Sequence, residues 1–418
     1  MAIPRIRLNL TTKDLFEFFF NVFCHKSEKA SEEVIGRFER EFAACFGLKR
    51  GLAVSKARIA FFLLLKNLPL KKGGEIIISA LHIADFVNMI RLAGFVPVVV
   101  DLQEDRYCVD YDDLERKISE RTALFIVTHL FGYATDMERI QNISMKFDVP
   151  FIEDCSQVVK SSFGEERLGT FGVASIFSMS LAKSVCTLFG GMILCKDDRL
   201  LESIRREARQ FSAPSRVLLV LEGVKNLILK IATAKVVFSW LTFPLVVSMS
   251  KVGDVFSRYQ KTNKTVELRE QMPTQFLTRF CWQQAIMGLS QLGTLDEREQ
   301  GRAGAGGSLY QRLASKERAY VPEMEKQSGN TFWLFPVIAE DVTGLKSFLL
   351  NYKIDSSGML LSCLADEPAF SDLQFKAPRA RRLKRNTLFL PMYWNISQVD
   401  IDRVVVAMEA YQSHEERS

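Results

Sequence analysis

Short apolar runs alternate with helix-length amphipathic segments through most of the chain. Six runs, most of them rich in isoleucine or valine, are the candidate strands: Leu52–Ser55, Ile76–Ser79, Val96–Asp101, Ala123–Thr128, Pro150–Asp154 and Ile176–Ser178. Residues 32–47 have apolar positions at helical spacing, and Gly47 is a typical helix stop. Strands of this composition, separated by helices, predict an α/β fold with a mostly parallel sheet that helices cover on both faces.

The change of pattern along the chain predicts four parts. These are an N-terminal apolar segment (1–30), a large α/β domain (31–212 with 266–300), an apolar and basic helical insertion (213–265), and a small C-terminal α+β domain (301–418). The last part is expected to contain an extended segment at Thr331–Ile338, a helix at Val342–Tyr352, a strand at Thr387–Leu390 and a closing helix from about Ser397 to Gln412. A length of 418 residues is ample for two domains.

The segment 216–249 is unusually apolar. Its longest run without charge, Val236–Ser250, has fifteen residues, which is shorter than the roughly 18–20 of a membrane-spanning helix. Its polar residues fall on one helical face: Glu222, Lys225, Asn226, Lys230 and Thr233. Two interpretations remain open, namely a peripheral membrane contact through 216–249 and a helix buried against the body or in a dimer contact. The apolar cluster Leu15–Phe23 could extend the same patch.

Composition narrows the class of protein. A hydrophobic fraction of 48% and a net charge of +6 are those of a folded globular chain with a modest preference for anionic partners. The eight cysteines are scattered and no secretory signal is recognised, which predicts reduced thiols in the cytoplasm, with a peripheral place at the inner face of the membrane as an option. The four histidines lack ligand spacing, so no metal is expected. No nucleic-acid recognition module accompanies the basic residues, and no G-x-G-x-x-G follows the first strand.

Candidate chemistry gathers after the predicted strands. Asp154 ends one strand, and Lys183 follows another, twenty-nine residues later in the chain. Ligands of parallel sheets bind at the carboxyl ends of strands, where Ser178 also falls. A lysine amine that bonds to an aldehyde and an aspartate that keeps a pyridine nitrogen protonated are the pair needed to hold pyridoxal 5′-phosphate. Taken alone, a lysine after an apolar strand is usually a surface residue, and an aspartate at a strand end is often only a helix cap. The prediction therefore depends on the two residues occurring together.

With these residues in view, the chain resembles the DegT/DnrJ/StrS family of pyridoxal-phosphate-dependent sugar aminotransferases. The likeness runs from about Glu32 to Gln210 and from about Arg279 to the end. Its motifs are Glu153–Gln157 for E-D-x-x-Q, Phe177–Lys183 for F-S-x-x-x-x-K with Gly190-Gly191 after it, His129–Gly132 for H-L-Y-G, Gln284-Ala285, and Leu390–Met392 for L-P-M. Several motifs in the family's order are a far more specific signal than any one of them.

The resemblance implies a fold-type-I (aspartate aminotransferase) scaffold and a role for each matched residue. Lys183 would hold the cofactor and transfer a proton, Asp154 would pair with the pyridinium nitrogen, Gln157 would approach the ring hydroxyl, and Ser178 would donate to the phosphate. His129 and Arg279 are the candidate substrate residues. The implied reaction moves an amino group, from glutamate, to a nucleotide-linked keto-sugar for surface polysaccharide, lipopolysaccharide or other amino-sugar biosynthesis. A homodimer with its sites at the interface is also implied.

Several positions depart from the family pattern. Lys56-Ala57-Arg58 stands where the family has S-G-T, so we expect the Ala57 amide and the Arg58 guanidinium to bind the cofactor phosphate. His82 and Ile83 occupy the place where the family has an aromatic residue that covers the cofactor ring. Phe189 stands where the family has a glutamate, and Leu277 where it has an asparagine. Two alternatives therefore stay open. One is a sugar dehydratase on the same scaffold, which the retained Lys183 disfavours; the other is a non-catalytic, membrane-associated relative, which the altered phosphate site favours.

A basic run, Lys376–Arg385, carries six basic residues in ten and is expected to be a loop. It is either a solvated surface segment or a site for a nucleotide diphosphate or an anionic membrane surface.

Overall fold

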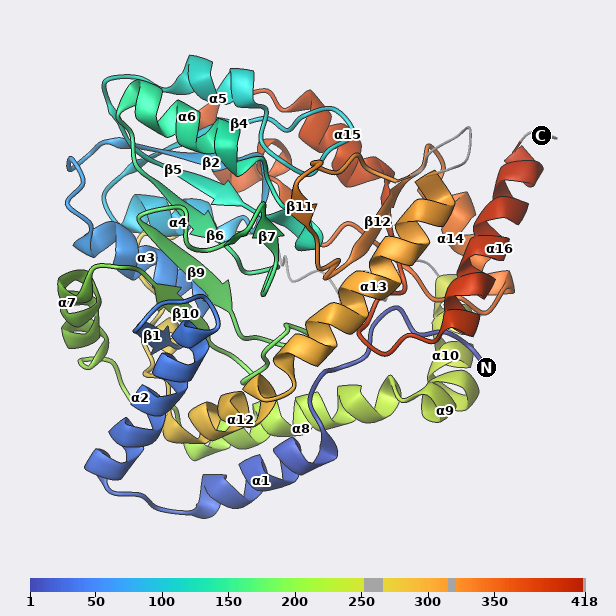
Figure 1. Ribbon diagram of the computed structural model, residues 1–418, viewed down its shortest axis with the longest axis horizontal. Helices are drawn as coiled ribbons and strands as arrows, with labels where there is room; N and C mark the ends of the chain where they lie inside the picture. Colours follow the sequence, from blue (N-terminus) through green and yellow to red (C-terminus); the bar gives the residue numbers. More distant parts are fainter. Residues whose placement is uncertain (252–265, 315–320, 416–418) are drawn as a thin grey trace.

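The computed structural model describes residues 1–251, 266–314 and 321–415. A seven-stranded sheet in the order β1-β10-β9-β6-β5-β2-β4 forms its centre (Figure 1). The strands are β1 (Gly51–Val54), β2 (Glu75–Ser79), β4 (Val96–Val100), β5 (Thr122–Thr128), β6 (Phe151–Asp154), β9 (Ala174–Ser178) and β10 (Gly191–Leu194). From β4 to β9 neighbouring strands are parallel, and β10 is antiparallel to both its neighbours. The predicted mostly parallel sheet is confirmed. Strand β10, which was not predicted from the sequence, runs opposite to its neighbours β1 and β9.

Alternation along each strand sends side chains to two cores, one on each face of the sheet. In β2, Ile76 and Ile78 join the core on one face, and Ile77 joins the core on the other. The first core is covered by α3 (Ala57–Asn67), α4 (Asp85–Leu92) and α7 (Asp198–Ala208), and the second by α2 (Glu28–Ala44), α5 (Tyr111–Lys117), α6 (Met137–Phe147) and α12 (Trp282–Leu292). Figure 1 shows these helices around the sheet. The helix expected at 32–47 is α2, which begins and ends earlier; Gly47 follows it with φ +69°.

The C-terminal part holds a second, antiparallel sheet in the order β12-β15-β13. Its strands are β12 (Phe335–Ile338), β13 (Ser357–Gly358) and β15 (Thr387–Leu390), and its helices are α14 (Val342–Asn351) and α16 (Gln398–Glu415). The long helix α13 (Leu295–Ala314) connects the two parts and runs without a break through residue 300. At the other end of the chain, Ile3 forms an isolated parallel bridge with Ile354, so the N-terminal segment lies against the C-terminal part of the chain.

Shorter elements lie between the main ones. They are β3 (Leu81–His82) with β14 (Ser362–Cys363), the ribbon of β7 (Ser162–Phe163), β8 (Glu166–Arg167) and β11 (Ser328–Gly329), and short 3-10 helices at Leu130–Gly132, Thr274–Phe276, Leu364–Asp366 and Pro368–Leu373. Pairing of β3 with β14 brings the chain around His82 against the C-terminal part.

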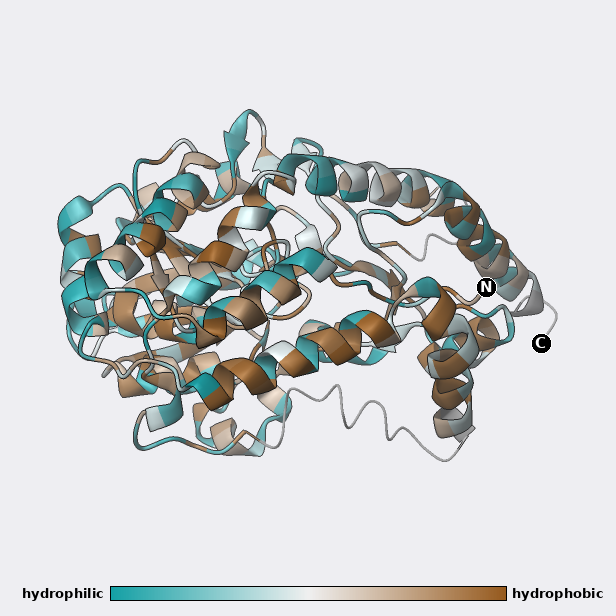
Figure 2. Ribbon diagram, turned by 90° about the horizontal axis from the view of Figure 1, so that it is seen from below, coloured by the Kyte–Doolittle hydropathy of each residue, from teal (hydrophilic) through white to brown (hydrophobic). Residues whose placement is uncertain are grey.

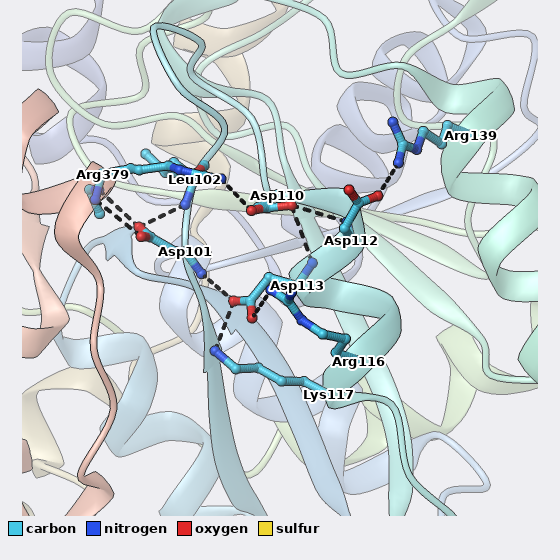
Figure 3. Close-up of polar contacts among 10 residues, drawn as sticks. Asp101, Leu102, Asp110, Asp112, Asp113, Arg116, Lys117, Arg139 and Arg379 are labelled. Atoms are coloured by element: carbon cyan, nitrogen blue, oxygen red, sulfur yellow. Dashed lines mark hydrogen bonds and ion pairs between the residues drawn. The ribbon is translucent and has the colours of Figure 1, made fainter.

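The basic run is not a loop: it forms α15 (Pro378–Asn386). Pro378 occupies the first turn, where its missing N–H costs nothing. The carboxylate of Asp101 accepts the N–H groups of Arg379 (3.1 Å) and Ala380 (2.9 Å), and the Arg379 side chain pairs with Asp110, as Figure 3 shows. Arg381 and Arg382 pair with Asp366 and Asp105 at 2.7 and 2.9 Å. The prediction of a loop was wrong because Asp101 caps the first turn of this helix and because Arg379, Arg381 and Arg382 have carboxylate partners, so their charges do not require a solvated loop.

The apolar insertion is helical where the structure describes it. It contains α8 (Arg216–Ala232), α9 (Lys235–Val237), a π-helical turn (Phe238–Thr242) and α10 (Phe243–Lys251), and α8 packs beside α1 (Thr12–Phe23). The remaining residues of the expected insertion, 252–265, lie outside the described chain. In the ranges that are described, no single helix has the length and apolarity to cross a membrane. Arg216–Ala232 with Lys235–Met249, a pair bent by 66°, meets both criteria when taken together.

Candidate functional site

A cavity of about 600 Å³ lies where β5, β6 and β9 end. The ladder of these strands places Thr128 beside Asp154 and Asp154 beside Ile176, so residues at the strand ends share one edge of the sheet. Eight of the ten residues predicted for the site line this cavity: Ala57, Arg58, His82, Ile83, Asp154, Gln157, Ser178 and Lys183. The structure therefore brings together residues that span more than a hundred positions of the sequence.

Lys183 follows β9 in a turn that the surrounding chain holds in place. Ala182 before it has φ +65°, and the Asn9 side-chain amide donates to the Lys183 carbonyl at 3.0 Å. Its Nζ lies 3.4 Å from the ring centroid of Trp333, whose indole N–H donates to the Ala182 carbonyl at 2.8 Å. Burial lowers the pKa of Lys183 to about 7; Asp154 opposes this shift and Arg302 adds to it. Near neutral pH, a large share of this amine is therefore unprotonated and nucleophilic.

Asp154 ends β6 as a buried carboxylate with defined partners. One oxygen lies 3.2 Å from His82 Nε2, and the other accepts the Ser156 N–H at 2.9 Å. Burial alone would raise the pKa of Asp154, but the hydrogen bond and charge of His82 hold that pKa below its ordinary value. The His82 ring also lies 4.4 Å from the ring of Phe86 and 3.2 Å from Thr128 Oγ1. The cavity thus contains a fixed anion that suits a cationic group of a ligand.

The N-terminus of α3 opens into the same cavity. Lys56 is its N-cap and makes no side-chain cap, and the amides of Ala57 and Arg58 have no acceptor among the described residues. Gly191 at the start of β10 allows this approach, because a Cβ there would lie 2.6 Å from the Lys56 carbonyl carbon and 2.7 Å from the Ala57 nitrogen. Uncapped amides at a helix N-terminus bind anions, phosphate above all.

Three cations surround this helix end. The Arg58 guanidinium pairs with Asp85, which also accepts from Arg269 Nε at 2.7 Å. Burial and the neighbouring Arg58 charge lower the pKa of Lys56. Nearby, the hydroxyls of Ser178 and Ser180 lie 3.0 Å apart on the cavity wall. This set of amides, hydroxyls and cations has the chemistry of a phosphate site.

Gln157 borders the cavity with its side chain oriented by the backbone. Its Oε1 accepts the Phe131 N–H at 2.8 Å, which leaves the amide nitrogen as the group available to donate elsewhere. Ser156, next to it, has a buried hydroxyl with no hydrogen-bond partner among the described residues. Within the described chain, the Gln157 amide nitrogen and the Ser156 hydroxyl therefore have no hydrogen-bond partner at the cavity.

The two predicted substrate residues do not line the cavity. His129 has no exposed surface; its Nε2 lies 3.3 Å from Glu153, and its Nδ1 accepts the Thr135 N–H at 3.3 Å. His129, Glu153 and Cys155 could geometrically group around a metal ion, but Glu153 already accepts the N–H groups of Gly169, Phe171 and Gly172. Arg279 is exposed, and its N–H donates to the Ser212 carbonyl at 2.8 Å. The His129 side chain therefore connects Glu153 in β6 to the backbone at Thr135, outside the cavity lining.

Sequence reasoning missed three residues of the site. Asp85 and Arg269 line the cavity, where the Asp85 carboxylate pairs with both Arg58 and Arg269. Trp333 contacts the Lys183 amine. Asp85 could have been found, since it opens a helix only two residues after Ile83. Arg269 and Trp333 come from distant parts of the chain, and no local pattern marks them.

A second cavity of about 560 Å³ adjoins the first and shares Lys56 and Phe189 with it. Its wall takes residues from the start of α8, among them Ser215, Leu218 and Glu222, and from the turn at Thr274–Phe276. The site therefore continues beyond the lysine cavity toward the apolar insertion.

Comparison with known proteins relates the chain to one family. Residues 25–226 and 248–409 match the model of the DegT/DnrJ/EryC1/StrS aminotransferase family. The chain is 26% identical to the spore coat polysaccharide biosynthesis protein SpsC of Bacillus subtilis, over 90% of this chain and 88% of that protein. It is 24% identical to the GDP-perosamine synthase of Caulobacter vibrioides, over 97% and 98% of the two chains.

Solved structures share the fold over nearly the whole chain. An aminotransferase from Psychrobacter cryohalolentis superposes with a TM-score of 0.76 at 17% identity, covering 98% of this chain and 99% of that one. The fold-type-I scaffold predicted from the sequence is confirmed.

Proposed function

The chain belongs to the DegT/DnrJ/EryC1/StrS aminotransferase family, and from that membership we propose that it transfers an amino group to a keto-sugar with pyridoxal 5′-phosphate as cofactor. One observation carries the proposal. A lysine amine with a pKa lowered to about 7, a buried anionic aspartate and an uncapped helix N-terminus share one cavity. These are a nucleophile, a partner for a cationic ring nitrogen and an anion site.

The residues present fit this cofactor. The amides of Ala57 and Arg58, with the hydroxyls of Ser178 and Ser180, would bind the phosphate, and Arg58 and Lys56 would neutralise it. Asp154 would pair with the ring nitrogen, and the remaining donor of Gln157 would reach the ring hydroxyl. His82 and Ile83 would lie along the ring. When bound, pyridoxal phosphate supplies an aldehyde and an electron-withdrawing ring.

The chain's own groups would perform the binding and proton transfer. Lys183 Nζ, with a pKa of about 7 that leaves much of it unprotonated near neutral pH, would hold the cofactor through its aldehyde carbon. Once released from that carbon, the same amine would accept and return the proton of the substrate carbon. Asp154, held ionised by His82, would stabilise a positive charge on the ring nitrogen throughout. Trp333 would cover the amine and keep water from it.

A nucleotide-linked keto-sugar is the proposed acceptor and L-glutamate the proposed donor. The second cavity supports a substrate longer than a single sugar, because it extends the site past Lys56 and Phe189. A relative named GDP-perosamine synthase supports the nucleotide, and one named for spore coat polysaccharide biosynthesis supports a surface polysaccharide as the destination. Product amino sugars would then enter polysaccharide assembly.

We also propose a cytoplasmic homodimer. All eight cysteines are free thiols, which supports a reducing compartment. Arg279 is exposed and lies outside its own chain's cavity, a place that suits a residue acting on the site of a second subunit.

Replacing Arg58 by alanine is expected to weaken pyridoxal-phosphate binding about tenfold, because a charge-assisted donor to the phosphate is lost. Equilibrium titration of the ligand-free chain with the cofactor measures this change. The matched control is Arg91→Ala, which removes a cation of α4 that pairs with Asp372 outside the cavity and leaves the cavity intact. Unchanged affinity in Arg58→Ala would show that Arg58 serves Asp85 alone.

The function is tested by supplying the holoenzyme with L-glutamate and measuring 2-oxoglutarate. An aminotransferase releases one 2-oxoglutarate per occupied site without any acceptor, since the amino group stays on the cofactor. Cofactor binding without 2-oxoglutarate would favour the sugar dehydratase or another donor. Failure to bind the cofactor at all would favour the non-catalytic relative, which the replacement of S-G-T by Lys56-Ala57-Arg58 makes a real competitor.

A further inference from the structure

Helix α8 turns its polar side toward the protein and its apolar side outward. Asn226 is 1% exposed and lies 3.8 Å from Cys186 Sγ, and Lys230 Nζ donates to the Leu10 carbonyl at 2.5 Å. The outward residues are 39–68% exposed: Val217, Leu221, Val224, Ile228 and Ile231. Their spacing of three and four residues makes them one continuous stripe. A surface helix of a globular protein normally has the opposite orientation.

The stripe continues on both neighbours of α8. Helix α1 packs against α8 through Phe18 and Phe19, which touch Gly223 so closely that a Cβ there would lie 2.9 Å from the Phe19 ring. The far side of α1 exposes Phe16, Phe20 and Phe23 by 66–73%. Beyond the 66° bend, Val236, Trp240, Leu241 and Leu245 are 56–80% exposed. These twelve residues on α1, α8 and α9–α10 are the apolar face; Figure 2, seen from below, shows the largely hydrophobic α8 and α10 ribbons.

The charges on the segments that carry the apolar face are positive on balance. Residues 216–249 contain Arg216, Lys225, Lys230, Lys235 and Glu222, and α1 adds Lys13, Asp14 and Glu17. Lys225 pairs with Glu222 at 3.4 Å and Lys235 with Asp400 at 2.6 Å. Exposed apolar side chains are ordinary when scattered, but a contiguous patch over three helices marks a contact surface. Apolar side chains with an exposed tryptophan and flanking cations are the composition of helices that lie in the interface of an anionic bilayer.

We propose that the apolar face docks on the surface of a bilayer that contains anionic lipid. Helices α1 and α8 lie in the interfacial plane, and Trp240, 80% exposed, inserts at the level of the headgroups. Arg216, which is exposed at the start of α8, contacts the headgroup phosphates, and Lys225 lies at the edge of the stripe beside Glu222. A two-fold contact between copies of this face would place two surfaces of net positive charge against each other, whereas anionic lipid neutralises that charge. Charge therefore favours lipid over a second copy of the chain.

Sedimentation with vesicles tests the docking surface. The full chain is mixed with vesicles of phosphatidylcholine alone or with about 30 mol% phosphatidylglycerol. We expect it to sediment with the anionic vesicles and to be released by high salt. Leu221→Gln with Ile228→Gln replaces two exposed side chains of α8 and is expected to weaken this binding by about tenfold or more. The matched control, Met145→Gln, changes an equally exposed apolar residue on α6 and leaves binding unchanged.

Tryptophan fluorescence gives an independent readout. A blue shift on adding anionic vesicles is expected, and Trp240→Phe removes most of it although the other three tryptophans remain. Recovery of the wild-type chain in the supernatant with both vesicle types would overturn the proposal, as would equal binding of the α8 double variant. The face would instead join two copies of the chain if the wild-type chain did not bind vesicles and the double variant had a smaller mass by light scattering than the wild type. None of these readouts depends on aminotransferase activity.

Discussion

Lys183→Ala is expected to lower amino transfer by about ten-thousandfold or more, because one change removes the group that holds the cofactor and the group that moves the proton. The reason lies in the environment of the amine. Nζ lies against the Trp333 ring, and burial brings its pKa to about 7, so it works as a neutral base where an exposed lysine would stay protonated. Initial rates at saturating glutamate, with a keto-sugar acceptor or as single-turnover release of 2-oxoglutarate, measure the effect.

Two further variants separate chemistry from folding. Lys183→Arg keeps a cation at the position but cannot supply a neutral amine, so it should be as inactive as the alanine variant. Lys146→Ala removes an exposed lysine that pairs with Glu115 on the outer surface and should leave the rate unchanged. Circular dichroism of all three should match the parent. Substantial activity in Lys183→Arg would mean that this position contributes charge and not an amine.

Asp154→Asn is expected to lower amino transfer by about a hundredfold to a thousandfold, because the amide cannot stabilise a cationic ring nitrogen. The fold should tolerate the change, since asparagine has nearly the same shape and can still accept from the Ser156 N–H. Asp112→Asn, at an exposed carboxylate that pairs with Arg139, is the matched control. A fully active Asp154→Asn enzyme would refute the assignment of Asp154 to the ring nitrogen.

The same substitution changes a pH profile with a definite sign. In the ligand-free parent, cofactor capture requires unprotonated Lys183, so its rate should rise as pH increases through about 7. The Asp154 carboxylate raises the pKa of Lys183 against the larger effect of burial. Removing that charge lowers the pKa further, and the rise should move to a lower pH. A profile that moves upward, or stays in place, would contradict the proposed electrostatic coupling of the two residues.

Local patterns predicted the scaffold and the centre of the site. Strand ends are local features, so Asp154 and Ser178 could be placed at one edge of the sheet, and the spacing to Lys183 is a short-range property of the turn after β9. The phosphate end was also accessible, because Lys56 to Arg58 follow a strand and open a helix. The strand β10 was missed because it begins at the second of two adjacent glycines and contains only three apolar residues after it.

Tertiary contacts account for what the sequence did not reveal. Trp333 reaches Lys183 from the C-terminal part, and Arg269 meets Asp85 across 184 positions, so neither pairing leaves a periodic signal. The amphipathic pattern of α8 was recognised, but a pattern alone does not say which side faces the protein. Only the contacts of Asn226 and Lys230 fix that orientation. His129 was a substrate candidate through its match to H-L-Y-G, and its side chain is buried against Glu153 outside the cavity lining, so a role in substrate binding stays a prediction.

The most direct test of the account is the visible absorption spectrum of the chain with pyridoxal phosphate, recorded before and after L-glutamate, beside Lys183→Ala. The account predicts a visible band of lysine-bound cofactor in the parent, its loss on adding glutamate, and no such band in the variant. A parent chain that gives no band at saturating cofactor, or a band that persists in Lys183→Ala, would contradict the claim that this cavity is a pyridoxal-phosphate site built on Lys183.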